Sequence, residues 1–214
     1  MSTAPPPYVL RNPAAPLLIL LSAPSGGGKT TLSQRLLARH PEITRAITCT
    51  TRPPRPGERD GADYYFIDSA AFERRVAAGG FLEHAAVYGH AYGTPKSEVL
   101  ERLRQGRDVL LNVDVQGAAT LCSAAARDPD LRGALVTVFL TPVSLAELEL
   151  RLRKRAADTE AALRKRLGLA RAEIAQWRNF QYLIISTTFA EDLRRMECIL
   201  EAERMRPSRA LPPV

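Results

Sequence analysis

The distribution of apolar and polar residues along the chain predicts an α/β fold. Short, wholly apolar runs are typical of parallel strands buried on both faces, and here they alternate with longer segments in which apolar residues recur at helical spacing. Strands are predicted at residues 17–21, 108–115, 135–140 and 181–187, and helices at 29–40, 116–127 and 189–205. This order predicts a three-layer fold, in which right-handed crossovers place helices on both faces of a parallel sheet.

A different pattern occupies residues 48–98, where short segments and loops rich in proline and charge replace the helical repeats. The elements predicted in and just before this region are strands at 43–51 and 63–67 and a helix at 69–78. We therefore expect residues 48–98 to form a lobe inserted into a core of residues 17–47 and 99–206.

Near the end of this lobe the sequence predicts a turn followed by a helix. Residues 89–93 contain two glycines and are predicted to turn. A helix is then expected to begin at Thr94–Pro95, because Thr is a favoured N-cap residue and Pro suits the first helical position. It is predicted to end near Gln105, before Gly106.

The two ends of the chain lack the pattern of a packed element. Residues 1–16 are rich in proline and are predicted to form a disordered lead-in, with a docking ligand as the alternative. Residues 207–214 are predicted to be a loose tail.

The composition is that of a soluble globular protein, and the net charge indicates which class of partner it binds. The 214 residues are 45% hydrophobic and 25% charged, and the three cysteines lack metal-ligand spacing. A formal net charge of +7 favours an anionic partner. We favour nucleotide over nucleic acid, because the basic residues are scattered and no aromatic-basic platform is present. Without an apolar run of ~20 residues or a secretory signal, we expect a cytoplasmic protein that does not bind membranes.

A glycine-rich loop joins the first predicted strand to the first predicted helix. It consists of Ala23, Pro24, Ser25, Gly26, Gly27, Gly28, Lys29, Thr30 and Thr31. A strand, a glycine-rich turn, Lys-Thr and a helix form an arrangement that binds nucleotide phosphates, because backbone amides converge on the anionic oxygens. Lys29 is then expected to reach the β- and γ-phosphates, and Thr30 to bind Mg²⁺. Ala23 replaces the usual first glycine, and the alternative interpretation is an ordinary turn.

Other charged residues are placed where phosphoryl transfer needs them. Arg52 and Arg55, held among prolines, suit phosphate oxygens because a planar guanidinium can bind two of them. Asp114 follows a buried strand, where phosphate-loop enzymes place an acid that supports the metal. Taken alone, the arginines also fit a solvated loop and Asp114 a helix cap.

An arginine-rich helical region begins with a capping box at Ser144–Glu147 and is predicted to form a small lid at about 144–163. Cations on a lid can neutralise the charge of a phosphoryl group during transfer. Several of its basic residues, among them Arg153 and Arg164, are interpreted as a solvated face.

In order and spacing these motifs resemble those of the guanylate kinases, P-loop enzymes that phosphorylate GMP from ATP. The resemblance covers about residues 17–205. It is carried by the phosphate loop, by Thr50-Thr51-Arg52-Pro53-Pro54-Arg55-Pro56-Gly57-Glu58 with Tyr64, by Phe81-Leu82-Glu83-His84-Ala85 with Tyr92-Gly93-Thr94, and by Asp114-Val115-Gln116-Gly117.

For the acceptor, the resemblance implies that Glu83 accepts hydrogen bonds from guanine N1 and N2. Thr94 would contact O6, and Thr48 stands where the family usually has a serine that contacts guanine. The resemblance also implies that the GMP phosphate is held by Arg52, Arg55, Tyr64 and Tyr92. A carboxylate suits guanine, whose edge donates, whereas N1 of adenine is itself an acceptor.

For the donor and the reaction, the resemblance implies a site at the phosphate loop closed by lid arginines. Lys29, Asp114, Arg151, Arg155 and Arg166 are the predicted catalytic residues. Ser186 stands where the family carries an asparagine near the donor adenine, and Asn112 replaces the first Asp of the family's Asp-x-Asp.

We therefore expect transfer of a phosphoryl group from ATP to GMP or dGMP, with Mg²⁺. One alternative is a related kinase acting on another phosphorylated acceptor, such as a ribose bisphosphate, for which Glu83 would have no use. The other is a non-catalytic guanylate-kinase-like binding module, which would not need Lys29 and Thr30.

Overall fold

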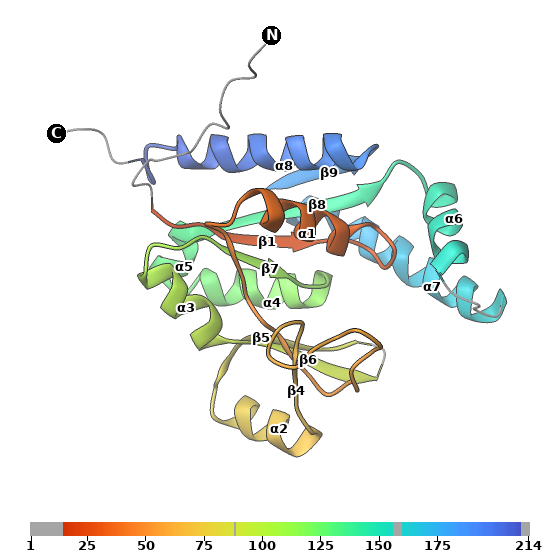
Figure 1. Ribbon diagram of the computed structural model, residues 1–214, viewed down its shortest axis with the longest axis horizontal. Coiled ribbons are helices and arrows are strands. Elements are labelled where there is room, and N and C mark those ends of the chain that lie inside the picture. Colours follow the sequence, from red (N-terminus) through yellow and green to blue (C-terminus); the bar gives the residue numbers. More distant parts are fainter. Residues whose placement is uncertain (1–14, 88, 156–159, 211–214) are drawn as a thin grey trace, which may run out of the picture.

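The computed structural model describes residues 15–87, 89–155 and 160–210 (Figure 1). Its core is a parallel five-stranded sheet with the order β2-β7-β1-β8-β9. The strands are β1 (Leu18–Ser22), β2 (Thr44–Arg45), β7 (Val109–Asn112), β8 (Leu135–Pro142) and β9 (Tyr182–Ser186). The predicted α/β fold on a parallel sheet is confirmed.

Strand β1 lies at the centre of this sheet and is buried on both faces, as its continuous apolar run predicts. Leu18 to Leu21 are each 0% exposed, and successive side chains enter two different hydrophobic clusters. The helices on one face are α1 (Lys29–Arg39) and α8 (Phe189–Arg204), and those on the other are α3 (Lys96–Arg104), α4 (Val115–Ala125) and α5 (Pro129–Ala134). The phosphate loop therefore leaves the carboxyl end of a rigid central strand, where parallel sheets bind ligands.

A second, smaller sheet with the order β4-β3-β6-β5 lies beside the core (Figure 1). Its strands are β3 (Cys49–Thr50), β4 (Tyr65–Phe66), β5 (Phe81–Val87) and β6 (His90–Pro95), and helix α2 (Ser69–Ala77) packs on it. Cys49, Phe72 and Phe81 form the buried centre of this lobe. A separate hydrophobic cluster gives the lobe its own packing while two chain segments connect it to the core.

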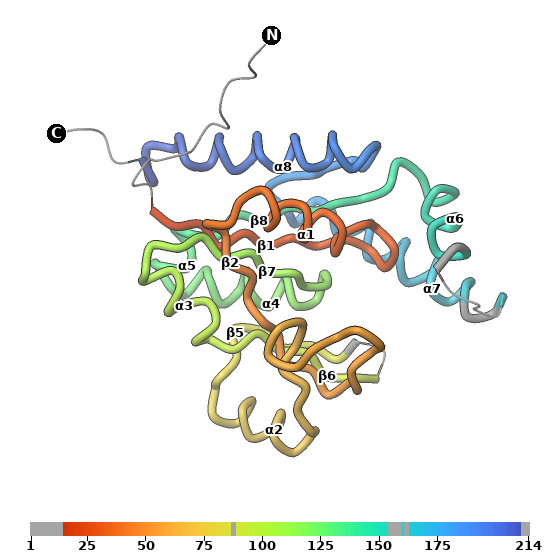
Figure 2. Tube along the Cα trace, viewed as in Figure 1, coloured from red at the N-terminus to blue at the C-terminus, as the bar shows by residue number. Residues whose placement is uncertain are grey.

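Helices α6 (Leu145–Arg155) and α7 (Glu160–Ile174) lie together at one end of the molecule, beyond the carboxyl end of β8 (Figure 2). Leu148 and Leu152 of α6 pack with Leu163 and Ala170 of α7. A short 3₁₀ helix, η1 (Ala175–Asn179), leads from α7 towards β9. A Cβ placed on Gly26 would lie 2.9 Å from Cδ2 of Leu152, so this helical pair packs directly against the phosphate loop.

Three local predictions are wrong. Residues 43–51 form two strands that belong to different sheets, because β2 pairs with β7 whereas β3 pairs with β6. Residues 89–93 do not form a five-residue turn, because β5 and β6 make a hairpin in which His90 already pairs with Val87. Thr94 is consequently a strand residue, and α3 begins at Lys96 without a side-chain cap.

The carboxyl-terminal tail is anchored through Arg209, contrary to the predicted loose tail. The Arg209 side chain donates to the carbonyl oxygens of Gly133 (Nε, 2.9 Å) and Leu135 (Nη2, 3.2 Å), and it forms an ion pair with Glu203, which is 0% exposed. The predictions for residues 1–14 and 211–214 lie outside the described residues. Within residues 15–87, 89–155 and 160–210, no helix combines the length and hydrophobicity that crossing a membrane requires.

Candidate active site

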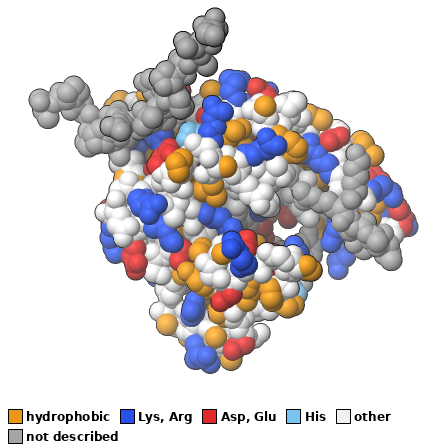
Figure 3. All heavy atoms as spheres, in the orientation of Figure 1, with side chains coloured by type: hydrophobic (Ala, Val, Ile, Leu, Met, Phe, Trp, Pro, Cys, Tyr) orange, Lys and Arg blue, Asp and Glu red, His pale blue; other side chains and the backbone are white. Residues whose placement is uncertain are grey.

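A cleft of about 470 Å³ lies between the core and the lobe, where the space-filling view shows the surface hollowed (Figure 3). The phosphate loop forms one side of it and the small sheet the other. The predicted site residues that line it are Ala23, Pro24, Ser25, Gly26, Gly27, Gly28, Lys29, Thr30, Thr48, Arg55, Tyr64, Glu83, Tyr92 and Asp114. Segments from three parts of the chain thus meet at one cavity, as the sequence predicts.

The backbone of the phosphate loop depends on two glycines. Gly26 and Gly28 have φ angles of 82° and 98°, in the left-handed region that glycine adopts without steric cost. Gly28 is the N-cap of α1, so the first amides of this helix point at the cleft and favour an anion there. The loop is therefore shaped to receive phosphate oxygens.

Lys29 supplies a buried cation beside these amides. Its Nζ donates to the carbonyl oxygen of Val113 at 2.8 Å, which orients the side chain across the carboxyl end of β7. Burial lowers the pKa of Lys29, while the nearby carboxylates of Asp114, Glu173 and Glu83 oppose that shift. Bound phosphates would favour the charged form further.

Glu83 is a buried carboxyl group on the lobe side of the cleft. It is 3% exposed, and its Oε1 accepts a 2.6 Å hydrogen bond from the hydroxyl of Thr94. Burial raises the pKa of Glu83 to about 7, although the hydrogen bond from Thr94 acts in the opposite direction. A buried carboxylate that lines a cavity is an acceptor prepared for a ligand that donates.

The turn after β7 brings two further groups towards Glu83. Asp114 is the N-cap of α4, and its Oδ1 accepts from the amide of Gly117 at 2.9 Å. A Cβ on Gly117 would lie only 2.7 Å from Oε2 of Glu83, so glycine is needed there for the helix and the carboxyl group to meet. Asp114 therefore both caps α4 and lines the cleft.

Of the two arginines predicted to bind phosphate, Arg55 lines the cleft and Arg52 does not. Arg52 is 8% exposed, and its Nη2 donates to both carboxylate oxygens of Glu58 at 2.9 Å. Its Nε also donates to the hydroxyl of Tyr92 at 3.3 Å. Arg55 reaches the cleft, whereas Arg52 lies behind it and packs on the ring of Tyr64, 5.5 Å from the centroid.

The three predicted lid arginines lie on α6 and α7. A Cβ on Gly28 would lie 3.8 Å from Nη1 of Arg151, so this guanidinium group sits beside the phosphate loop, with its Nε bonded to Glu147 at 2.9 Å. Arg166 is half-buried on α7. Arg155 is the last residue of α6, and its side chain lies outside the described part of the structure.

The predicted adenine contact at Ser186 is not supported by the geometry. The Ser186 side chain is buried, and its hydroxyl donates to Oδ2 of Asp192 at 2.6 Å. It thereby ties the end of β9 to the first turn of α8 and does not line the cleft. Thr31 and Thr94 also lie outside the lining, the latter directly behind Glu83.

Several residues that line the cleft were not predicted from the sequence, and Glu173 and Arg45 are two charged examples. Glu173 of α7 accepts a 3.1 Å hydrogen bond from the amide of Ser25, which ties α7 to the phosphate loop, and burial raises its pKa. Arg45 reaches the cleft from β2. Neither belongs to a local motif, because each enters the site through packing between distant segments.

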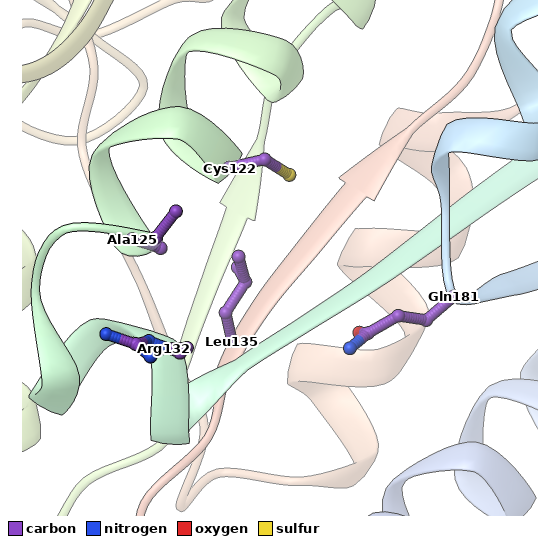
Figure 4. Close-up of a pocket in the computed structure, with 6 residues that line it drawn as sticks. Cys122, Ala125, Arg132, Leu135 and Gln181 are labelled. Atoms are coloured by element: carbon purple, nitrogen blue, oxygen red, sulfur yellow. The ribbon is translucent and has the colours of Figure 1, made fainter.

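A second cavity, of about 270 Å³, lies at the amino ends of β8 and β9 (Figure 4). Cys122 and Ala125 of α4, Arg132 of α5 and Leu135 line it together with Gln181. The amide oxygen of Gln181 is already taken by the backbone of Thr137 at 2.8 Å. Leu135 and Gln181 stand at the amino ends of β8 and β9, so this cavity is separate from the phosphate loop.

The cleft contains oxygen atoms suited to Mg²⁺ but no cage built from protein alone. Among the described residues, no group of three or more His, Cys, Asp or Glu side chains converges on a metal position. The hydroxyl of Thr30 and the carboxylate of Asp114 line the same cleft. This set fits Mg²⁺, which commonly takes one or two protein oxygens and completes its shell with substrate phosphates and water.

A phosphate loop at the end of a buried strand, a buried lysine and a lobe with an acceptor carboxylate define the class of P-loop nucleotide kinases. A sequence model of the guanylate kinase family matches residues 16–203. The guanylate kinase of Maricaulis maris is 44% identical over 201 residues, covering 94% of this chain and 89% of the relative. That of Paramagnetospirillum magneticum is 42% identical over 193 residues, covering 90% and 87%. The chain belongs to the guanylate kinase family.

A crystal structure agrees with this assignment. That of guanylate kinase from Anaplasma phagocytophilum superposes with a TM-score of 0.74 at 30% identity, covering 92% of this chain and 90% of the other.

Proposed function

We propose that this protein transfers the γ-phosphoryl group of ATP to GMP or dGMP in the cytoplasm, with Mg²⁺. Membership of the guanylate kinase family supports ATP as donor and GMP as acceptor. The observation that carries the proposal is the buried carboxyl group of Glu83 in the same cleft as Lys29 and the phosphate loop. One end of the cleft suits phosphates and the other suits a base that donates hydrogen bonds.

Guanine is the base that this carboxyl group suits. Its N1–H and 2-amino groups donate side by side, and a carboxylate accepts at both oxygens. Thr94 holds Glu83 in place, and Thr48 lines the cleft nearby and offers a further hydroxyl. Adenine would present the acceptor N1 to the carboxylate, and an unpaired buried acceptor costs binding energy.

The phosphate of GMP is proposed to lie between the lobe and the phosphate loop. Arg55, Tyr64 and Tyr92 line the cleft there, and Arg52 supports both rings from behind. A bound nucleotide would thus be held at its base and at its phosphate, which fixes the acceptor oxygen for in-line attack.

Catalysis in this proposal is positioning and charge stabilisation. The acceptor phosphate is already an anionic nucleophile, so no general base is needed. Lys29 stabilises the β- and γ-phosphates, while Arg151, Arg155 and Arg166 neutralise the charge of the group in transfer. Closure of the lobe and of the helices α6 and α7 would exclude water, since water would otherwise compete as acceptor. Thr30 and Asp114 would hold Mg²⁺, which supplies charge neutralisation to the donor phosphates.

Product analysis tests this proposal directly. With ATP alone, ADP is expected to form slowly, and added GMP should accelerate ADP formation while GDP appears in equal amount. Chromatography of the nucleotides at several time points measures both. Accelerated ADP formation without GDP would show that GMP is not the acceptor.

Gly117→Ala is expected to impair acceptor binding while sparing donor binding. The added methyl group would lie 2.7 Å from Oε2 of Glu83 and 3.2 Å from Oδ1 of Asp114, so the carboxyl group must move. Overpacking of this kind costs roughly 1–3 kcal/mol, which corresponds to about a 5- to 150-fold rise in KM for GMP. Steady-state kinetics measure it, with Gly133→Ala as the control, because a Cβ there meets no atom within 4 Å. An unchanged KM for GMP would contradict the position assigned to Glu83.

GMP affinity is expected to fall as the pH is lowered through about 7. Burial raises the pKa of Glu83 to about 7, so the free protein increasingly carries the protonated carboxyl group below that pH. Guanine needs the ionised form, so binding must release this proton, and affinity drops by up to about tenfold per pH unit. Guanosine, which lacks the titrating phosphate, is the ligand that isolates this effect in a calorimetric titration. A flat pH profile for guanosine would contradict this role of Glu83.

A further inference from the structure

Arg45 is a second arginine, besides Arg55, that lines the acceptor end of the cleft. It ends β2, and its side chain is half-buried and lines the same cavity as Arg55 and Tyr64. Its guanidinium carbon lies 5.9 Å from the centroid of the Tyr64 ring, and that of Arg52 lies 5.5 Å from the same centroid. Two guanidinium groups thus lie over one tyrosine ring, and Arg45 is the one that lines the cleft.

The two arginines differ in their partners. Arg52 is neutralised, because its Nη2 donates to both carboxylate oxygens of Glu58 at 2.9 Å. The guanidinium of Arg45 donates to the backbone carbonyl oxygen of Asp63, and within the described residues no carboxylate pairs with it. The carboxylate of Asp63 instead accepts from the amide of Arg59 at 2.9 Å. Within the described residues the positive charge of Arg45 is therefore not compensated by a carboxylate, and its remaining N–H groups can donate to an anion.

The charge of a nucleoside monophosphate explains why such a group is useful here. Its phosphate carries close to two negative charges at neutral pH. Since Glu58 already neutralises Arg52, Arg55 alone would leave one of these charges without a cation at the acceptor end of the cleft. The guanidinium group of Arg45, which lies over the Tyr64 ring, adds a second cation there. Its planar pair of N–H donors matches the oxygens of a phosphate.

We propose that Arg45 binds the phosphate of GMP and contributes a cation that Arg52 does not supply. This inference rests on the proposed function. It makes β2, a strand of the core sheet, part of the acceptor site, so that the phosphate lies at the junction of core and lobe. Arg45 is then a substrate-binding residue whose loss affects GMP and leaves ATP binding unchanged.

Calorimetric titration of Arg45→Gln with GMP and with guanosine tests the proposal. Loss of a charge-assisted contact is expected to weaken GMP binding on the order of tenfold or more. Guanosine binding should stay the same, because guanosine has no phosphate. Arg45→Lys should recover part of the GMP affinity, since it restores the charge without the planar fork. Arg74→Gln, an exposed change on α2, is the matched control and should bind both ligands like the unmodified protein.

Two outcomes would overturn the inference. Equal weakening of GMP and guanosine would show that Arg45 only supports the packing of Tyr64, and an unchanged GMP affinity would show that it does not meet the phosphate. Failure of the unmodified protein to bind GMP would instead overturn the proposed function, and this inference with it. The ratio of the two affinities therefore separates phosphate binding from a structural role.

Discussion

Lys29→Met is expected to lower kcat for phosphoryl transfer by on the order of 10³-fold. Lys29 is the buried cation of the phosphate loop, and its Nζ is fixed by the carbonyl oxygen of Val113 at 2.8 Å. Met keeps the approximate length and volume of the side chain but removes the charge. The fold is expected to persist, because an apolar group at this position does not carry the desolvation cost of a buried ammonium group.

Steady-state kinetics at saturating ATP and GMP measure this effect. Lys96→Met, at the exposed start of α3, removes the same charge away from the cleft and should leave kcat unchanged. Thermal unfolding of each variant checks that the structure is intact. A folded Lys29→Met protein that turns over like the unmodified one would refute the assignment of the phosphate loop as the donor site.

Glu83→Gln is the second large effect that we expect, with kcat/KM for GMP falling on the order of 10³-fold. The substitution turns one of the two acceptor oxygens into an amide donor that faces the donating edge of guanine, so one of the two buried hydrogen bonds is replaced by a repulsive donor–donor contact. The hydroxyl of Thr94, which donates to Oε1 at 2.6 Å, can still hold the side chain, so the change acts on recognition more than on folding.

Comparison of GMP with IMP makes this test specific. IMP keeps N1–H but lacks the 2-amino group, so the variant should lose less activity towards IMP and the preference for GMP should shrink. Glu73→Gln, an exposed substitution on α2, is the matched control. An unaltered ratio of kcat/KM for GMP over IMP would mean that Glu83 does not read the base.

The core of this fold could be predicted because its signals are local. The run from Leu17 to Leu21 has no polar residue, which is typical of a strand covered on both faces, and all five side chains are 0% exposed. The phosphate loop is equally local, since its glycines and Lys29 lie within one turn and the helix begins at the predicted residue. Such features need no knowledge of the rest of the chain.

The hairpin formed by β5 and β6 could not be predicted, because it depends on pairing between two segments and not on a local signal. Thr94 followed by Pro95 is a helix-start signal, but Thr94 pairs with Glu83 across β5 and β6, and this pairing buries its hydroxyl against the carboxyl group. Tertiary pairing overrides local preference where a buried polar group needs a partner. The same pairing is what holds the proposed guanine-reading residue.

The hydrogen-bond partners of several predicted site residues could not be predicted from the sequence either. The motif around Arg52 indicates a phosphate contact, yet Glu58, six residues later, already takes its guanidinium group. Ser186 is similarly occupied by Asp192. Arg45 and Glu173 reach the cleft from a core strand and from α7, so only the packed structure brings them to the phosphate loop.

The central claim, that the acceptor is a guanine nucleotide, is tested most directly by comparing acceptors. Release of ADP from ATP and Mg²⁺ is measured in a coupled assay with GMP, AMP, UMP and a ribose bisphosphate, and kcat/KM is determined for each. We predict that GMP exceeds AMP and UMP by on the order of 10³-fold or more, because only guanine offers two donors to Glu83. Turnover with a ribose bisphosphate or AMP and none with GMP would contradict the account.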